Sequence, residues 1–386
     1  MRLPCGIVSA VLGFEEARCF APRPSLAMSL AIVGAGLSGL AAAYVLRDTD
    51  ADVTLFEKSR GVSGRAATRG RGQVRYDHGA NHFKIKTDRF GSLVREQLPT
   101  DDLVEITGDV WTFEEDGRLQ EGDPEKNAEA KWTYRDGVSR LGKHLAEAAG
   151  AEIQTETRVT LLAQNGDDGN AWTLADAEGR EHSPFEAVLL TPPAPQTADL
   201  LKAGRLGDDA LQKHLTEALA PVSYRTQLTL VLAYRRRVER PDGCYALLNA
   251  DGAHEIAWLG FEEEKPGHVP APGSAGPAPE SVLVAQMGPG WSRPRFRSGR
   301  GALVPEVTAL VGELLDKDVS RPHWADKQGW RYALPEDAAD AEALADGAEA
   351  GLFFAGDALA GRGRVGAAVE SGLDAGERLR QHLERG

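Results

Sequence analysis

Cysteine, lysine and long apolar runs are all scarce in this chain of 386 residues. Its three cysteines, Cys5, Cys19 and Cys244, fit neither a disulfide framework nor a metal-spaced cluster, so we expect a reducing cytoplasm and no metal. No apolar run reaches the roughly eighteen residues that a membrane-spanning helix needs. Basic residues number 44 against 58 acidic ones, for a net charge of -14. Such a chain repels nucleic acid, which leaves a small-molecule partner and an open oligomeric state.

The first 27 residues do not match a secretory signal. Their short apolar stretch is interrupted by Glu15 and Glu16, and no small-residue cleavage box follows it. A second methionine, Met28, stands directly before the first predicted strand. We therefore interpret residues 1–27 as a disordered N-terminal extension, with a targeting role as the alternative.

Strand and helix patterns gather at the two ends of the chain. Residues 29–34 and 51–58 are predicted strands that flank an Ala/Leu-rich helix over 37–48, which is the length of one β-α-β unit. Residues 187–193 form another apolar run, closed by a proline pair, and residues 352–383 give a strand, a glycine-rich turn and a long helix. We expect both ends to share one sheet, with a second domain inserted between them.

The middle of the chain has weaker signals. Residues 110–119, "VWTFEEDGRL", are predicted to form a hairpin, and residues 137–150 a helix closed by Gly150. The Pro/Gly-rich loop at 265–280 has no core-forming residues, and we expect it to be mobile.

The stretch "GAGLSG" follows the first strand and opens the first helix. Gly34, Gly36 and Gly39 let the strand turn sharply, let backbone approach a pyrophosphate, and let helix and strand pack closely. The helix N-terminus offers N–H groups to the phosphates. Glu57 ends the second strand, where a carboxylate can accept hydrogen bonds from ribose. This context favours dinucleotide binding over an unrelated glycine turn.

The residues after Glu57 favour FAD over NAD. A nicotinamide dehydrogenase would continue into a crossover helix, whereas here a flexible basic loop follows, with Lys58, Gly64 and Arg65. The Arg65 guanidinium can fork onto phosphate oxygens, although a solvated basic loop would look the same in isolation.

The far end of the chain supports this reading. Asp357 follows a strand and a glycine, where its carboxylate can accept from ribityl hydroxyls. Gly366 and Ala367 open the last helix, whose positive end can stabilise negative charge at a flavin ring. A plain glycine-rich corner between strand and helix is the alternative.

Together these blocks resemble the renalase-like branch of the FAD-dependent amine oxidase superfamily. The blocks are "AIVGAGLSGLAAAYVL", "VTLFEKSRGVSGRAATR", "YDHGANHF", "GVSRLGKHLA", "FEAVLLTPPAPQT", "GWRYALP" and "LFFAGDALAGRGRVGAAVESG". The resemblance implies an α/β fold: a Rossmann-type, GR2-like FAD-binding domain with a mixed sheet, plus an inserted α+β substrate domain. It also implies that Val159 reaches the adenine through its backbone. The residues expected to bind FAD are Gly34, Ala35, Gly36, Leu37, Ser38, Gly39, Glu57, Lys58, Gly64, Arg65, Ala80, Asn81, Val159, Gly356, Asp357, Gly366 and Ala367.

We divide the chain accordingly. The FAD-binding domain is expected over 28–95, 131–195 and 345–386, and the substrate domain over 96–130 and 196–344. No cysteine lies near the C-terminal flavin block, so FAD is expected to bind without a covalent link.

The residues expected beside the flavin ring depart from the branch. "HGANHF" has Asn81 and His82 where relatives often have Gln and Tyr, and "QGWRYALP" lacks the basic residue or His often seen before the Trp. We select His82, Trp330 and Tyr332 as pocket candidates, because aromatic faces can sandwich a flat ring. Core packing or a structural histidine is the alternative for each. The inserted domain adds residues that fit core packing better than the cavity, namely Tyr224, Tyr245, His254 and Trp258.

Several functions are compatible with this reading. The leading one is a renalase-like oxidase that takes hydride from a small reduced substrate, a dihydronicotinamide isomer, to flavin and then to oxygen. The alternatives are an amine oxidase or a desaturase-like enzyme on the same scaffold, and a non-catalytic flavin-binding module. The desaturase is disfavoured because no amphipathic membrane-facing helix is evident. An NAD dehydrogenase leaves Arg65 and the C-terminal block unexplained.

Overall fold

The structure is a computed structural model, and it describes residues 28–165, 171–271 and 278–385. The predicted extension at 1–27 lies outside the described residues, as does the stretch 272–277 of the Pro/Gly-rich loop.

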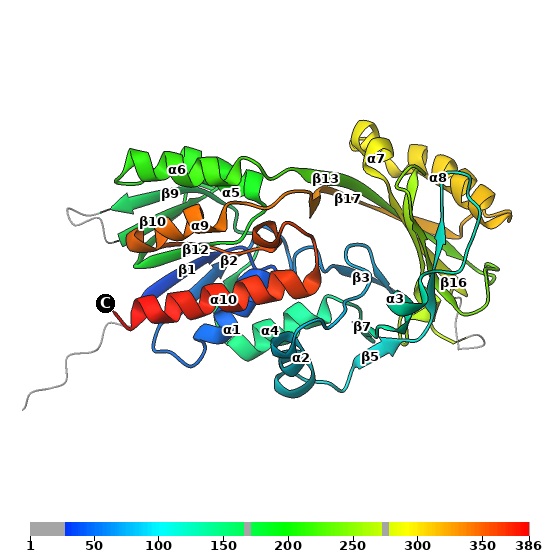
Figure 1. Ribbon diagram of the computed structural model, residues 1–386, viewed down its shortest axis with the longest axis horizontal. Coiled ribbons are helices and arrows are strands. Elements are labelled where there is room, and N and C mark those ends of the chain that lie inside the picture. The colour runs from blue at the N-terminus through cyan, green and yellow to red at the C-terminus, as the bar shows by residue number, and fades with distance from the viewer. Residues whose placement is uncertain (1–27, 166–170, 272–277, 386) are drawn as a thin grey trace, which may run out of the picture.

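A five-stranded parallel sheet joins the two ends of the chain. Its order is β18 (Leu352–Phe354), β12 (Ala187–Leu190), β1 (Ser29–Val33), β2 (Asp52–Phe56) and β8 (Glu152–Gln154). The central strands are short apolar runs because both of their faces are covered. The N-terminal β-α-β unit and the C-terminal strand therefore share one sheet, as predicted (Figure 1).

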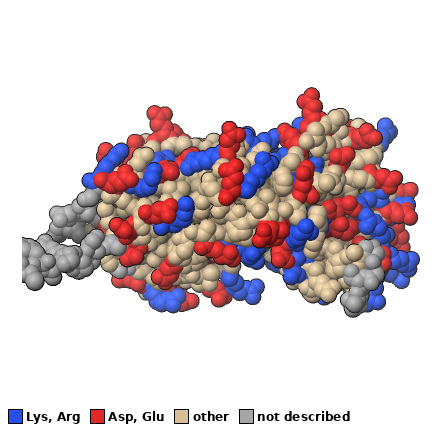
Figure 2. All heavy atoms as spheres, turned by 90° about the horizontal axis from the view of Figure 1, so that it is seen from below, with Lys and Arg blue, Asp and Glu red and all other residues tan. Residues whose placement is uncertain are grey.

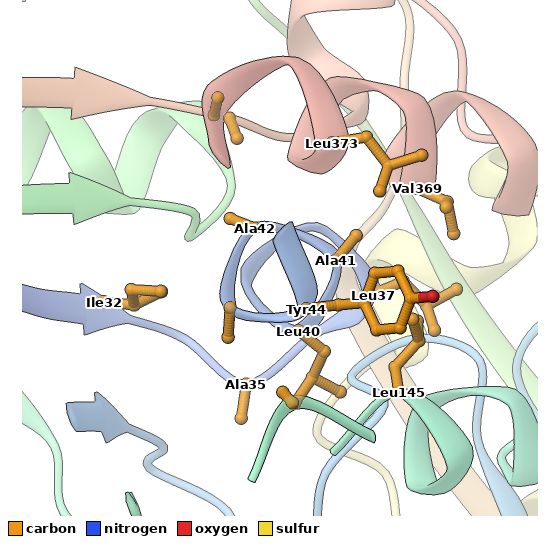
Figure 3. Close-up of a cluster of buried hydrophobic side chains, with 14 of the residues drawn as sticks. Ile32, Ala35, Leu37, Leu40, Ala41, Ala42, Tyr44, Leu145, Val369 and Leu373 are labelled. Carbon is orange, nitrogen blue, oxygen red and sulfur yellow. The ribbon is translucent and has the colours of Figure 1, made fainter. Parts of the chain in front are cut away.

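Helices cover one face of this sheet. They are α1 (Leu37–Leu46), α4 (Arg140–Ala149) and α10 (Val365–Leu383). In Figure 3, Ala41 of α1 faces Val369 and Leu373 of α10, and Leu145 of α4 lies on the opposite side of α1. The approach is so close that a Cβ atom at Gly372 would lie 2.1 Å from the carbonyl oxygen of Ser38. The small residues of α1 and α10 therefore position the beginnings of both helices.

A second layer covers the other face. It consists of an antiparallel sheet and two helices: β9 (Val159–Asn165), β10 (Ala171–Asp176), β11 (Glu181–Phe185), α5 (Ala194–Ala203) and α6 (Asp209–Leu219). Trp172 and Leu162 are fully buried in the core between the two layers.

A six-stranded sheet forms the other lobe. Its order is β17 (Trp324–Pro335), β13 (Tyr224–Tyr234), β16 (Ser281–Met287), β15 (Ile256–Phe261), β14 (Cys244–Asn249) and β6 (Asp109–Phe113). Helices α7 (Pro289–Arg295) and α8 (Arg300–Leu315) pack on its outer face. The long strands β13 and β17 run from this lobe toward the first one (Figure 1).

Two features of the middle region differ from the prediction. The hairpin predicted at 110–119 is present only in part. The chain turns back between Glu114 and Gly117, and Thr112 and Gln120 exchange two backbone hydrogen bonds in an antiparallel bridge, but the ladder of β6 runs parallel to β14. The loop beginning at 265 does contribute to the core, because Lys265 and His268 are fully buried. The helix predicted at 137–150 is present as α4, and Gly150 closes it in the left-handed conformation.

The remaining elements are short. They are β3 (Thr68–Arg71), β4 (Val74–Asp77), α2 (Asp88–Ser92), η1 (Leu93–Gln97), β5 (Leu103–Ile106), α3 (Pro124–Ala128), β7 (Lys131–Tyr134), η2 (Glu262–Glu264), α9 (Ala341–Ala345), η3 (Asp346–Ala350) and η4 (Asp357–Ala360). The β3–β4 ribbon lies against the six-stranded sheet, where Val74 and Tyr76 contact the apolar residues of β13 and β16.

The fold is thus the predicted one, a Rossmann-type α/β layer with a second lobe inserted into it. No helix within the described residues is long and apolar enough to cross a membrane. On the face seen in Figure 2, acidic and basic side chains are interspersed without a continuous basic stripe.

Candidate flavin and substrate site

The β1–α1 turn has the geometry that a dinucleotide requires. Gly34 has a φ of 103° and donates its N–H to Phe56 across the sheet. A Cβ atom at Gly39 would lie 2.1 Å from the carbonyl oxygen of Gly34, so only glycine allows helix and turn to meet. Around Gly36, in contrast, nothing lies within 4 Å of an added Cβ. The turn is therefore tightly packed at Gly39, whereas the space beside Gly36 is open.

Glu57 lies beside this turn and is 7% exposed. Its carboxylate accepts the N–H of Ala35 at 3.0 Å and the N–H of Ser59 at 2.8 Å. Each carboxylate oxygen has a second lone pair, so hydrogen bonds from ribose hydroxyls remain possible. The Lys58 ammonium instead points to the Gln196 side chain, 2.9 Å away.

The start of β9 approaches the same end of β2. The N–H of Thr157 donates to the carbonyl oxygen of Glu57 at 2.9 Å, and Val159 is buried two residues later. The structure thus brings Val159 near Glu57. Its contact with adenine stays a prediction.

The basic loop after Glu57 connects the turn to a second loop, residues 78–82. Ser63 donates its N–H to Ala35, and Gly64 follows with a φ of 59°. The carbonyl oxygen of Arg65 accepts the N–H of Ala80 at 3.0 Å. Gly64, Arg65 and Ala80 are therefore held together by backbone hydrogen bonds.

Arg65 links the beginning of the chain to its end. Its guanidinium contacts the Asp357 carboxylate at 2.8 Å and donates to the carbonyl oxygens of Tyr332 and Ala333 at 3.3 and 3.2 Å. Asp357 is 5% exposed, so water screens this ion pair weakly. The guanidinium is thus already partnered, and its contact with a phosphate stays a prediction.

The N-termini of α1 and α10 have no side-chain caps, a feature that they share with α4, α5, α7 and α8. Neither α1, which begins at Leu37, nor α10, which begins at Val365, has a capping side chain or an acidic residue in its first turn. Gly366 and Ala367, half-buried at the start of α10, follow a turn in which Gly356 donates its N–H to the Ser371 hydroxyl. Free N–H groups and positive dipole ends suit a ligand with phosphates and an electron-rich ring. The residues present therefore fit FAD.

The His82 ring contacts two aromatic side chains of the other lobe. Its ring centroid is 5.8 Å from that of Tyr245 and 5.9 Å from that of Trp258. Burial, together with the nearby Lys265 ammonium, lowers the pKa of His82 to about 3. The imidazole is therefore neutral at neutral pH.

Trp330 meets a residue that the sequence analysis did not select. Its indole stacks on His78 with centroids 5.6 Å apart and planes inclined by 13°, and its N–H donates to the His78 carbonyl oxygen at 2.8 Å. Burial lowers the pKa of His78 to about 4. The block "YDHGANHF" contains His78, but no local pattern separates it from His82.

Buried polar atoms without a partner gather between this loop and the sheet. Thr229 and Trp258 both pair in register with Gln286, whose amide donates to the Gly79 carbonyl oxygen at 2.6 Å. Buried polar groups are normally hydrogen-bonded, so a cluster of orphans indicates a ligand site. Within the described residues, the orphaned atoms in this region are His78 Nδ1, Asn81 Oδ1, Thr229 Oγ1 and Trp258 Nε1.

The remaining aromatic candidates lie elsewhere. Tyr332 packs edge-on against Tyr224 with ring centroids 5.5 Å apart, and the Arg65 guanidinium lies 5.9 Å from the centre of the Tyr224 ring. His254 packs against Phe113 and accepts the N–H of Ile256 with Nδ1. Tyr245 is fully buried in an apolar cluster that Trp258 packs against, as expected for core packing, and both rings also approach His82. A role for either ring in the substrate pocket stays a prediction, and His254 lies away from His82's aromatic neighbours against Phe113.

The carboxylates near this loop are already paired. Asp77 and Glu262 lie 2.9 and 2.7 Å from the Lys265 ammonium. The Asp326 carboxylate accepts from the Arg69 guanidinium and from the Tyr76 hydroxyl, both at 2.8 Å. Beside the four orphaned atoms, the described residues thus offer neutral donors and acceptors rather than a free carboxylate.

Two family models match this chain. A model for an NAD(P)-binding Rossmann-like domain matches residues 32–96, and the model for flavin containing amine oxidoreductases matches residues 105–380.

Solved structures share the fold at low identity. A protein from Exiguobacterium sp. 255-15, assigned as a protoporphyrinogen oxidase, is 15% identical with a TM-score of 0.72, over 92% of this chain and 99% of that one. Cyclohexylamine oxidase from Brevibacterium oxydans IH-35A is 14% identical with a TM-score of 0.66, over 93% and 100%. Putrescine oxidase bound to putrescine is 14% identical with a TM-score of 0.65, over 92% and 99%.

Proposed function

Because this chain belongs to the flavin-containing amine oxidoreductase family, and so is an FAD-dependent oxidoreductase, we propose that it oxidises a small, neutral, planar substrate of the dihydronicotinamide type. The observation that supports this substrate class is the cluster of four orphaned polar atoms between aromatic walls, without a free carboxylate beside it. An alkylammonium ion would need such a carboxylate, whereas a carboxamide needs one donor and one acceptor. We keep oxygen as the final acceptor and the cytoplasm as the compartment.

In this reaction the protein would orient the substrate and exclude water from it. FAD, when bound, accepts the hydride and passes electrons on. His78 with Trp330, and Tyr245 with Trp258, would hold the substrate ring flat, because stacked and edge-on aromatic contacts fix a planar group. The neutral His82 would accept or donate a hydrogen bond without adding charge. Hydride transfer depends on the orientation of the substrate and on the exclusion of water more than on an acid–base pair.

Amine oxidation is the second candidate. The family membership favours it, and Tyr245, Trp258 and Trp330 would also enclose a neutral amine. In that case only the unprotonated amine would react, so the rate would rise with pH toward the amine's own pKa.

Anaerobic stopped-flow spectroscopy tests both candidates. The FAD-loaded protein is mixed in turn with 2- and 6-dihydro isomers of NAD, putrescine and cyclohexylamine, and flavin bleaching is followed. We expect rapid bleaching by a dihydro isomer and none by the amines. Bleaching by an amine alone would replace the proposal with amine oxidation.

A further inference from the structure

Two adjacent glutamates of η2 have side chains with different partners. Glu262 points toward the FAD-binding lobe, whereas Glu263 pairs with Arg240 inside the other lobe at 2.9 Å. Both carboxylates are buried. Only Glu262 contacts Asp77, the residue that precedes the 78–82 loop, and Glu263 serves below as its internal control.

Lys265 lies between carboxylates from the two lobes. Its ammonium is 2.9 Å from the Asp77 carboxylate and 2.7 Å from that of Glu262, and none of the three side chains reaches solvent. Asp77 ends β4, and it also accepts hydrogen bonds from Thr68 and from the N–H of Val138. The ammonium therefore joins a strand of one lobe to a turn of the other.

His268 completes the group. One ring nitrogen is 2.7 Å from the Glu262 carboxylate and the other is 3.1 Å from the Tyr134 carbonyl oxygen. The carbonyl oxygen of Tyr134 can only accept, so the nitrogen facing it carries a proton. Two carboxyl groups thus lie beside one ammonium and one imidazole in a site without solvent. The oxygens and nitrogen of Asp77, Glu262 and His268 lie close enough to hold a metal ion, but the Lys265 ammonium already bonds to both carboxylates.

This ionic group borders the substrate site. Asp77 directly precedes His78, and its N–H donates to Glu262 at 3.1 Å. The Lys265 ammonium is 6.0 Å from the centre of the Tyr245 ring, whose hydroxyl donates to the Asn81 carbonyl oxygen at 3.3 Å. Both ends of the 78–82 loop are therefore held by side chains that contact Lys265.

We propose that Lys265 is a positioning residue, which, with Asp77, Glu262 and His268, clamps the 78–82 loop against the substrate-side sheet and so sets the geometry of the substrate pocket. The inference concerns the site assigned above and rests on that assignment only for its kinetic readout. Buried charges favour this geometry strongly, because a charged group that loses its partner here cannot be solvated by water.

The matched pair Glu262→Gln and Glu263→Gln tests the clamp. Both variants weaken a buried ion pair one residue apart, so both are expected to lower the melting temperature. Only Glu262→Gln is expected to speed hydrogen exchange of the 78–82 amides in the FAD-free protein, by roughly tenfold. It should also raise KM for the bleaching substrate several-fold with a smaller change in kcat. Lys265→Arg should preserve slow exchange more than Lys265→Met does.

A double variant guards against simple misfolding. Asp77→Asn combined with Lys265→Met removes both charges and so should recover stability relative to Lys265→Met, because no buried charge is left alone. Its loop should nevertheless exchange faster than wild type. The proposal would be overturned if the 78–82 amides exchanged hydrogen at the same rate in Glu262→Gln, Glu263→Gln and the wild type. This outcome does not depend on the identity of the substrate. Failure of every substrate to bleach the flavin would instead count against the proposed function and leave the exchange result standing.

Discussion

At the scale of single residues, the Arg65–Asp357 pair connects segments from opposite ends of the chain. The pair stands between the glycine turn and the start of α10, and its carboxylate is almost fully buried. Arg65→Ala leaves that carboxylate unpaired and opens the region where FAD is expected. We predict a loss of FAD affinity of about tenfold to a hundredfold, since breaking a buried ion pair costs a few kcal/mol. Equilibrium dialysis of the FAD-free protein measures it.

Arg69→Ala is the matched control. Arg69 forms an ion pair of the same length, 2.8 Å, with Asp326 on the substrate side. Its removal should leave FAD affinity within about twofold while affecting the substrate step. Equal losses of FAD in both variants would mean that the Arg65 pair has no special relation to the cofactor.

A second residue-scale prediction concerns His78. Its pKa falls from 6.5 to about 4 in the folded protein, chiefly through burial. The unfolded chain therefore binds more protons between these values, so stability is complete above pH 6.5 and decreases as pH falls toward 4. We expect His78→Asn to flatten this decline, by about 1–2 kcal/mol between pH 7 and pH 5. Urea unfolding at several pH values compares the slopes, and parallel slopes would contradict the assignment of a buried neutral imidazole.

At the scale of elements, the contact between α1 and α10 fixes the N-termini of both helices, where we expect the flavin to bind. A Cβ atom at Gly372 would clash with the backbone of Ser38. We expect Gly372→Ala to destabilise the protein by roughly 2–4 kcal/mol, because a tightly packed interface must shift. Gly301→Ala in α8, where nothing lies within 4 Å of the new Cβ, should instead be neutral or stabilising by up to about 1 kcal/mol. Thermal unfolding of the two variants separates these outcomes.

Elements built from local signals were predictable, and those that depend on distant partners were not. The β1–α1–β2 unit and α10 follow from apolar periodicity and glycine spacing, which act within a few residues. The hairpin prediction for β6 captures only the local turn and its one bridge, because the main partner strand β14 lies far along the chain. Lys265 and His268 lie in a loop that was predicted to be mobile. Their burial could not be predicted, because their partner Asp77 also lies far away in the sequence.

At the scale of the whole molecule, the site lies where the two ends of the chain meet the inserted lobe. The glycine turn and the acids at strand ends on the expected cofactor side could be predicted, because their spacing is a local signal. The substrate side could not, because Thr229, Gln286 and Trp258 are ordinary strand residues until register brings them opposite the 78–82 loop.

This arrangement makes FAD a structural ligand as well as a cofactor. A ligand that binds only the folded state stabilises it by about 2.7 kcal/mol at a hundred times its Kd. We therefore predict that FAD raises the melting temperature of the FAD-free protein by several degrees, with NAD at the same concentration raising it little. An equal rise with NAD would favour a nicotinamide site.

The visible spectrum of the purified protein, recorded before and after anaerobic addition of a dihydro isomer of NAD, reports on cofactor and reaction together. We expect the yellow absorption of oxidised flavin, which bleaches on addition of the reductant and returns when air is admitted. A colourless protein that takes up no FAD would contradict the conclusion that both ends of the chain hold this cofactor.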